Sequence, residues 1–408
     1  SCAEYYCMIV TRLLPVFLLL GITGLSGEIA RAETPDALIA KGDVYDQRLN
    51  EKQALQYYLP ADRLEPNNPE LLIRIARQYR HWMSDASSRE EKLRLGYLSL
   101  GFAQRAATLA PHNPEAQLSP AISYGKMLPY MGSKEQVDAS PRIKQAVDRT
   151  LQLDPKNDTA WHILGRWNRV LANINVVKRV LAGALYGNLP VTTHEAAEKC
   201  LLKAIELNPN YSVAHHWYAI YLSVLGRESE ALAEIRRAHE LDPLSLSINA
   251  WLGWILVLAG QPDQAVEQLR KTLELDPNFM LAHLRLGYVY EEKGMYAEAI
   301  SEFEQVLKLS GGRFLGTASL AHAYALAGKR NEAQKLLNEL LQQSTQRYVS
   351  PASIAIVYVA LGDKDQAFAW LERGNEIRDM NVVRLKVDPR YESLRADPRF
   401  NDLVKRMG

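Results

Sequence analysis

Apolar residues recur along most of the chain with the spacing of amphipathic helices, and the apolar runs end in closely similar phrases. The phrase reads LELDPNF at 273–279, IELNPNY at 205–211 and HELDPLS at 239–245. Proline fixes φ and biases the residue before it out of the helical region, so each phrase predicts the end of a helix. The pattern therefore predicts an all-α chain that is interrupted at regular joints.

The joints are evenly spaced in the second half of the chain. Pro209, Pro243 and Pro277 lie 34 residues apart, and a further 34 residues lead to Gly311 in LKLSGG. Between residues 66 and 209 the intervals between prolines lengthen to 45, 44 and 54 residues. These longer intervals predict extended helices or insertions in the first half.

The residues inside each period fall into one register. In the repeat that begins at Met280, the recurring positions 7, 8, 11, the turn, 20 and 24 are Leu286, Gly287, Tyr290, Gly294, Ala299 and Phe303. This pattern resembles the tetratricopeptide repeat, which implies an α-solenoid of helical hairpins that forms a right-handed superhelix. Each hairpin has two apolar faces and must stack on its neighbours, so about nine hairpins are expected over residues 35–381.

Two sections resemble more specific groups. The segments NPELLIRIARQYR, EEKLRLGYLSLGFAQRAATL, WHILGRWNRV and KRVLAGALYGNLPVTTHEAAEKCLLKAIELNPN resemble the regulator-of-microtubule-dynamics family. That resemblance implies a helical repeat fold and protein binding, with no catalytic residues. The closing segment, LKVDPRYESLRADPRFNDLVKRMG, is similar to the ends of many bacterial tetratricopeptide proteins.

The N-terminal segment predicts export. From Met8, an apolar run at 13–25 follows Arg12 and leads to the small-x-small sequence at 30–32, which is typical of a signal-peptidase site. The run has 13 residues, whereas a membrane-spanning helix needs about 20. We therefore expect a start at Met8, cleavage after Ala32 and, with the tail's resemblance, a bacterial periplasmic protein. An exported chain does not meet microtubules, so that part of the family's name is not carried over.

The predicted organisation has four sections. They are an export signal region at 1–32, N-terminal helical repeats with long insertions at 35–211, five regular 34-residue repeats at 212–381 and C-terminal capping helices at 382–408.

Binding is expected on the concave side of the solenoid. In this fold the first helices of successive hairpins line a groove, mainly through positions 2, 5, 9 and 12. The register predicts these binding residues: His216, Ile220, Ser223, Ala250, Trp254, Val257, Leu284, Tyr288, Glu291, His322 and Ile356. Trp254 and Tyr288 are the expected anchors for a peptide or a partner helix. The family's carboxylate clamp of Lys and Asn is absent from these repeats, which disfavours an acidic C-terminal peptide. Alternatively, part of this surface packs internally or against a second copy.

Composition and motifs exclude several other functions. The formal net charge is +1 and no basic block stands out, so no nucleic-acid partner is expected. No phosphate-binding loop, paired-cysteine motif or His-Glu-x-x-His sequence occurs, so we expect no enzyme, no cofactor and no metal. After cleavage one thiol, Cys200, remains, and its apolar surroundings favour a buried structural role.

The leading interpretation is a non-enzymatic scaffold for protein–protein interaction in an exported complex, with no integral membrane span after signal cleavage. One alternative is an accessory or catalytic component of an envelope glycan- or peptide-processing system, which a convergent carboxylate or histidine pair in the groove would favour. A homo-oligomeric structural element is the other.

Overall fold

The computed structural model describes residues 33–86, 88–172, 190–310, 316–346, 348–377, 379, 382, 385 and 388–407. The expected export signal at 1–32, with its start at Met8 and cleavage after Ala32, lies outside these residues. Most of the insertion before Pro190 also lies outside them.

All secondary-structure elements among the described residues are helices. The first half contains α2 (Pro35–Gln47), α3 (Glu51–Leu64), α4 (Pro69–Asp85), α5 (Arg89–Leu109), α6 (Pro114–Met127), η1 (Leu128–Tyr130), α7 (Ser133–Leu153), α8 (Asp158–Ala172) and α10 (His194–Leu207). The second half contains α11 (Ser212–Val224), α12 (Glu228–Leu241), α13 (Leu246–Leu258), α14 (Pro262–Leu275), α15 (Met280–Glu292), α16 (Tyr296–Leu309), α17 (Thr317–Leu326), α18 (Arg330–Ser344), α19 (Pro351–Leu361), α20 (Lys364–Ile377), η3 (Pro389–Leu394) and α21 (Pro398–Met407).

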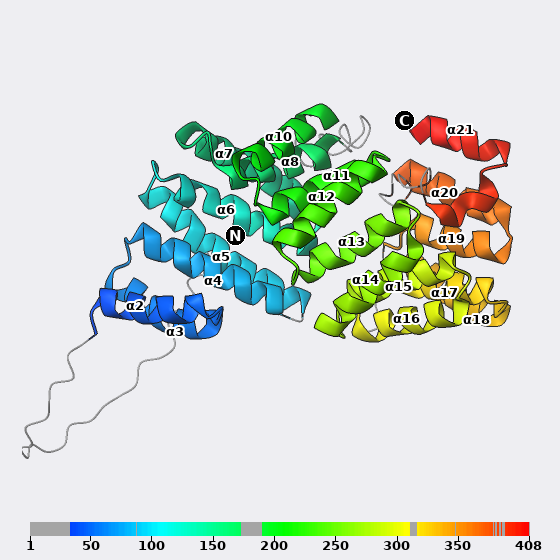
Figure 1. The fold of residues 1–408 in the computed structure, drawn as a ribbon, viewed down its shortest axis with the longest axis horizontal. Coiled ribbons are helices and arrows are strands. Elements are labelled where there is room, and N and C mark those ends of the chain that lie inside the picture. The colour runs from blue at the N-terminus through cyan, green and yellow to red at the C-terminus, as the bar shows by residue number, and fades with distance from the viewer. Residues whose placement is uncertain are drawn as a thin grey trace, which may run out of the picture.

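Consecutive helices pack as hairpins, and each hairpin packs on the next. From α2·α3 to α19·α20, nine such pairs occur in the described part of the chain, with α8 paired to α10. Figure 1 shows the pairs following one another from the blue α2 and α3 to the orange and red α19–α21. The predicted fold class, an all-α solenoid of helical hairpins, is confirmed. The longer intervals of the first half are partly helix extensions, since α4 has 17 residues and α5 has 21.

The turn glycines adopt the conformation that the register requires. Five of them have positive φ of 71–80°: Gly226, Gly260, Gly294, Gly328 and Gly362. An L-residue resists this left-handed region, so glycine allows the chain to reverse after the first helix of these five hairpins.

A recurring hydrogen bond closes the joints between hairpins. The carbonyl oxygen of the joint proline accepts a bond from the side chain six residues later, which is position 4 of the next repeat. The pairs are Trp161 Nε1 with Pro155 at 2.9 Å, His215 Nε2 with Pro209 at 3.0 Å, Asn249 Nδ2 with Pro243 at 2.7 Å, and His283 Nε2 with Pro277 at 2.9 Å. The hydrogen bond to Glu302 raises the pKa of His283. The position-4 side chains thus tie these four joints to the following hairpins.

The close approach of the two helices at position 8 predicts that alanine destabilises the protein at Gly253. At Gly101, where there is open space, alanine should stabilise it. A Cβ added at Gly253 would lie 2.5 Å from Cγ of the fully buried Leu269, whereas one added at Gly101 meets nothing within 4 Å. We expect Gly253→Ala to lower the free energy of unfolding by about 1–3 kcal/mol through overpacking. Gly101 is exposed on α5, and Gly101→Ala should raise the free energy of unfolding by up to about 1 kcal/mol because alanine favours the helix. Urea unfolding of both variants measures the two shifts, and shifts in the same direction would contradict close packing at position 8.

The C-terminal section only partly forms the expected cap. Helix α21 packs on α20, where Arg399 pairs with Asp365 at 2.8 Å and Arg406 with Glu372 at 2.9 Å. The preceding η3 instead contacts α19, the first helix of the last hairpin. The sequence predicted a cap on the end of the solenoid, whereas η3 lies on a first helix and so covers part of the predicted groove.

Candidate functional site

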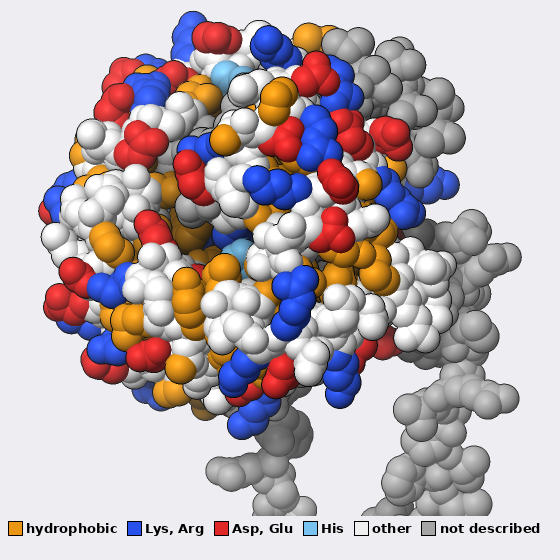
Figure 2. Space-filling view, turned by 90° about the vertical axis from the view of Figure 1, so that its right-hand side faces the viewer, with side chains coloured by type: hydrophobic (Ala, Val, Ile, Leu, Met, Phe, Trp, Pro, Cys, Tyr) orange, Lys and Arg blue, Asp and Glu red, His pale blue; other side chains and the backbone are white. Residues whose placement is uncertain are grey.

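The first helices of the hairpins form one continuous layer. Contacts link α4 to α6, α6 to α8, α8 to α11, α11 to α13, α13 to α15, and α17 to α19. We call the surface of these helices that faces away from the second helices the inner face. Seen from the C-terminal end, Figure 2 shows a hollow in the middle of the molecule, with hydrophobic side chains in its wall and basic and histidine side chains inside it.

The predicted binding residues lie on these helices, but most are buried. Trp254, Leu284 and Tyr288 are partly exposed. The others expose less than a tenth of their surface: His216, Ile220, Ser223, Ala250, Val257, Glu291, His322 and Ile356. Binding by the set therefore stays a prediction, and only the aromatic members and Leu284 have accessible surface.

One buried contact joins a histidine and a carboxylate on neighbouring first helices. His322 Nδ1 on α17 lies 2.9 Å from Glu291 Oε1 on α15, and each side chain is only 5% exposed. Such a pair is the arrangement that would favour a catalytic function. Here the two groups satisfy each other in the interior and have no free surface for a substrate.

The chain's own tail covers the same part of the inner face. The Arg390 guanidinium lies 4.8 Å from the ring centre of Tyr288, and Asp388 holds it with hydrogen bonds of 2.6 and 2.9 Å. Burial alone would raise the pKa of Asp388, but Arg390 outweighs it and holds that pKa below its usual value. The buried Tyr391 donates a hydrogen bond of 3.2 Å to the carbonyl of Ala352. From α15 to α19, therefore, part of the predicted groove is internally packed.

Towards α8, aromatic rings and guanidinium groups form an uninterrupted series that we call the stacked row. Its members are Arg166, Trp217, His216, Trp251, Arg285, Trp254 and Tyr288. Arg166 lies 3.7 Å from the centre of Trp217, and Arg285 lies 4.1 Å from that of Trp251. Trp254 and Tyr288 follow at 6.1 Å. The row crosses α8, α11, α13 and α15, so it joins four successive hairpins on one face.

The sequence register missed four of the seven residues in the stacked row. Trp217, Trp251 and Arg285 all stand at position 6 of their repeats, which was not among the groove positions. Arg166 was missed because the register was applied only from Ser212 onward. Trp161, Leu164 and Gly165 at positions 4, 7 and 8 place His162, Arg166 and Arg169 at positions 5, 9 and 12, so the signal was present.

The α8 end of the inner face is electropositive. Burial lowers the pKa of Arg166 to about 10, which leaves it charged near neutral pH. Burial, with a contribution from Arg166, lowers the pKa of His162 to about 3 and that of His216 to about 4. Both imidazoles are therefore neutral, and the buried Nε2 of each has no hydrogen-bond partner within the described part of the chain.

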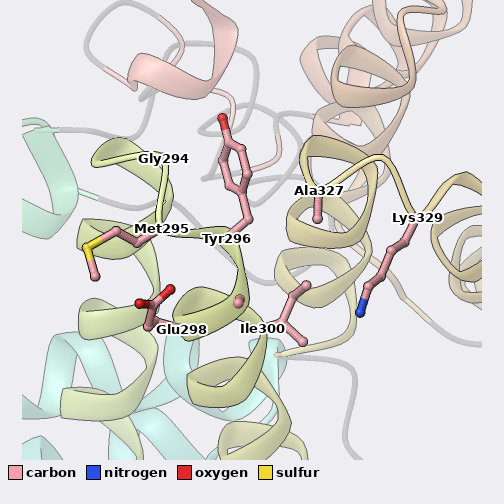
Figure 3. A pocket seen from close by; sticks show the side chains of 8 residues that line it. Gly294, Met295, Tyr296, Glu298, Ile300, Ala327 and Lys329 are labelled. Carbon is pink, nitrogen blue, oxygen red and sulfur yellow. The ribbon is translucent and has the colours of Figure 1, made fainter.

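Two surface depressions lie away from the inner face. One lies between the α15–α16 turn and the α17–α18 turn, where Met295, Ile300 and Lys329 line it (Figure 3). The other lies one repeat later, around Leu361, Asp365 and Arg399. Both are spaces between adjacent hairpin turns, and neither gathers groups for a reaction.

No metal-ligand cluster of three or more His, Cys, Asp or Glu side chains occurs in the described ranges. Cys200 is buried, and Asn168 donates to its Sγ at 3.6 Å. Among the helices described above, none combines the length and apolar composition needed to cross a membrane.

Comparison with known proteins decides the family. Residues 38–252, more than half of the chain, match the family described as regulator of microtubule dynamics protein 1-3. The chain belongs to this family. Residues 252–313 and 290–350 match tetratricopeptide repeats. The family match extends past residue 211 into α13, further than the quoted segments suggested.

The curated relatives are animal proteins. Regulator of microtubule dynamics protein 2 of Mus musculus is 27% identical over 200 residues, which cover 48% of this chain and 48% of the relative. Protein 1 of the same species is 30% identical over 199 residues, which cover 48% of this chain and 62% of the relative. The chain thus spans about half the length of the curated relatives it matches. Among solved structures, the human IFIT1 dimer with m7Gppp-AAAA superposes with a TM-score of 0.52 at 16% identity, covering 92% of this chain and 86% of IFIT1, and shows the fold alone.

These relatives correct one prediction. The assignment to a bacterial periplasm is wrong, because the matching relatives are eukaryotic regulators of microtubule dynamics. The error came from inferring a bacterial source from the N-terminal segment and the tail, both of which lie outside the residues that match the family. With the correction, the reason for setting aside the microtubule part of the family's name disappears.

Proposed function

We propose that the chain is a non-catalytic scaffold that binds a partner polypeptide on the inner face of α8, α11 and α13. The carrying observation is the stacked row, which presents the partly exposed rings of Trp217, Trp251 and Trp254 on one side of the solenoid. Rings fixed by their neighbours offer a large contact area at little entropic cost, which is why Trp is frequent among dominant contact residues.

The tail supports a polypeptide as the ligand. The segment from Asp388 to Leu394 lies against the same face three hairpins further on, at α19, with Tyr391 and Leu394 buried. The inner face therefore already binds a segment of its own chain. The neighbouring part of the same face, towards α8, is lined by the aromatic rings of the stacked row.

A catalytic component is less well supported. The one carboxylate–histidine pair found on the inner face, Glu291 with His322, is sealed in the interior. A homo-oligomer remains compatible with the same surface if the partner is a second copy, and light scattering on the purified chain identifies that case.

Trp254→Ala tests the proposed surface. Peptides are first selected from a displayed library on the purified chain, and their dissociation constants are measured by calorimetry. We expect Trp254→Ala to weaken the selected peptides about tenfold or more, because a ring central to the contact is lost. Trp370→Ala removes the same side chain from outer helix α20 and should change binding less than about twofold. Equal effects of the two variants, or none, would refute the inner-face site.

Regulation of microtubule dynamics is a second candidate, favoured by membership of the family and by the names of the relatives. Turbidity of polymerising tubulin, with and without the chain, tests it directly. An unchanged rate and plateau at saturating chain would leave the scaffold function without this partner.

A further inference from the structure

We propose that the α8–α11 end of the inner face is a binding site for an acidic peptide segment, in which Arg166 receives a carboxylate and Trp217 packs against a neighbouring side chain. The inference rests on the proposed function, since it specifies the chemistry of the partner polypeptide. It also revises the sequence argument against acidic peptides, which considered only the regular repeats from Ser212 onward.

The position of Arg166 leaves its hydrogen-bonding edge available. Its guanidinium stacks on Trp217 at 3.7 Å, so the flat face of the group is used by the ring. The N–H donors of a guanidinium lie in its plane, and a planar carboxylate can accept two of them side by side. No carboxylate within the described residues lies within ion-pair distance of Arg166, although this half-buried cation has lost much of its hydration. Stacking therefore orients the donors while their partner is missing.

Other cationic side chains lie near Arg166 on the neighbouring first helices. Lys126 on α6 has its pKa lowered by burial and by the charges of Arg80 and Arg166, so the three cations share one region. The buried Arg80 is held by the hydroxyls of Ser119 and Ser123 at 3.3 Å rather than by an acid. Elsewhere in the protein, arginines such as Arg77 and Arg227 pair with carboxylates. Although Glu115 partly offsets the charge of Arg80, the cations gathered in this region favour the approach of an anion.

Two unpartnered imidazole nitrogens lie in the same place. His162 is 4% exposed and His216 is 6% exposed, and Nε2 of each lacks a partner among the described groups. Arg166 is close enough to both rings to lower their pKa values. Buried polar atoms are normally satisfied, so two unpartnered nitrogens are an unusual feature of this part of the inner face.

A peptide fits this site better than a polymer of phosphates. The stacked row alternates single cations with apolar rings, whereas a nucleic-acid site needs phosphate contacts repeated along a basic track. The tail shows that a polypeptide packs on this face, since Tyr391 is buried there and donates to the Ala352 carbonyl, while its carboxylate, Asp388, pairs with Arg390 of the same segment. A partner segment with glutamate or aspartate beside apolar residues would instead place its carboxylate on Arg166 and an apolar side chain on Trp217.

The test uses the full chain and two labelled octapeptides, one alternating glutamate with leucine and one alternating glutamine with leucine. Fluorescence anisotropy should show that the chain binds the glutamate peptide at least tenfold more tightly than the glutamine peptide. Arg166→Gln should weaken the glutamate peptide at least tenfold, since a charge-assisted bidentate pair is lost, and leave the glutamine peptide unchanged. Arg237→Gln removes an equal charge from outer helix α12 and should change neither by more than twofold.

Further arms keep the result decisive. If Arg166→Gln lowers the urea midpoint, Arg166→Lys replaces it; this variant keeps the charge but not the planar donors, and it should weaken the glutamate peptide several-fold. Equal binding of the two peptides, or no effect of Arg166→Gln and Arg166→Lys, would overturn the proposal. So would tighter binding of a single-stranded oligonucleotide or of vesicles with anionic lipid at the same site. Selection of neutral peptides that depend on Trp254 but not on Arg166 would leave the proposed function intact and reject only the acidic ligand.

Discussion

Replacing Phe303 with alanine is expected to lower the free energy of unfolding by about 3–5 kcal/mol. Phe303 stands at position 24 of its repeat, on the second helix of its hairpin, and is completely buried. Its ring lies where a Cβ on Gly287 would be, at 2.5 Å, and 5.4 Å from the ring of Tyr288. Alanine would leave a cavity between α15 and α16 that the flanking hairpins cannot close without moving.

Phe303→Leu is the matched control, because leucine retains much of the apolar volume and should cost roughly 1 kcal/mol. Urea unfolding followed by circular dichroism gives both values. A loss below about 1 kcal/mol for the alanine variant would mean that this interface is not tightly packed and that the hairpins do not depend on each other as the fold implies.

Replacing Tyr391 with alanine is expected to release the tail from the inner face. Tyr391 is 2% exposed, and its hydroxyl donates to the Ala352 carbonyl at 3.2 Å. Losing a buried aromatic side chain costs about 3–5 kcal/mol, and the carbonyl loses its partner as well. The buried Leu394 and the contact of Arg390 with the Tyr288 ring would then be the anchors left for this short segment, so we expect it to detach while the preceding hairpins stay folded.

Two measurements separate this local effect from general unfolding. Limited proteolysis should cut the Tyr391→Ala variant near residues 388–394 well before the wild type, and hydrogen exchange should rise on α19 but not on α4 or α5. Tyr391→Phe removes only the hydroxyl and should cost about 1 kcal/mol without release. Unchanged cleavage in the alanine variant would show that the tail is not held by this side chain.

The sequence predicted the fold well because each repeat carries its own local instructions. The joint prolines, the turn glycines such as Gly226 and the small residues at position 8 act within one hairpin or between neighbours, so their effect can be read from spacing. The division of the chain at residue 211 and at residue 381 stays a prediction.

The candidate site was predictable only in part, because it depends on contacts that spacing does not encode. The register placed Trp254 and Tyr288 on the inner face, but Tyr288 is contacted by Arg390, about 100 residues later in the chain. Trp217, Trp251 and Arg285 belong to the row through contacts between neighbouring first helices. Such contacts and the docking of η3 are tertiary effects, and no repeat contains them alone.

The central claim is that a partner polypeptide binds the inner face of α8, α11 and α13. Hydrogen–deuterium exchange of the chain, with and without a saturating peptide selected on it, tests this claim most directly. The account predicts slower exchange on Asp158–Ala172, Ser212–Val224 and Leu246–Leu258, with little change on the outer helices α10, α12 and α14. Protection confined to those outer helices, with none on the three inner ones, would contradict it.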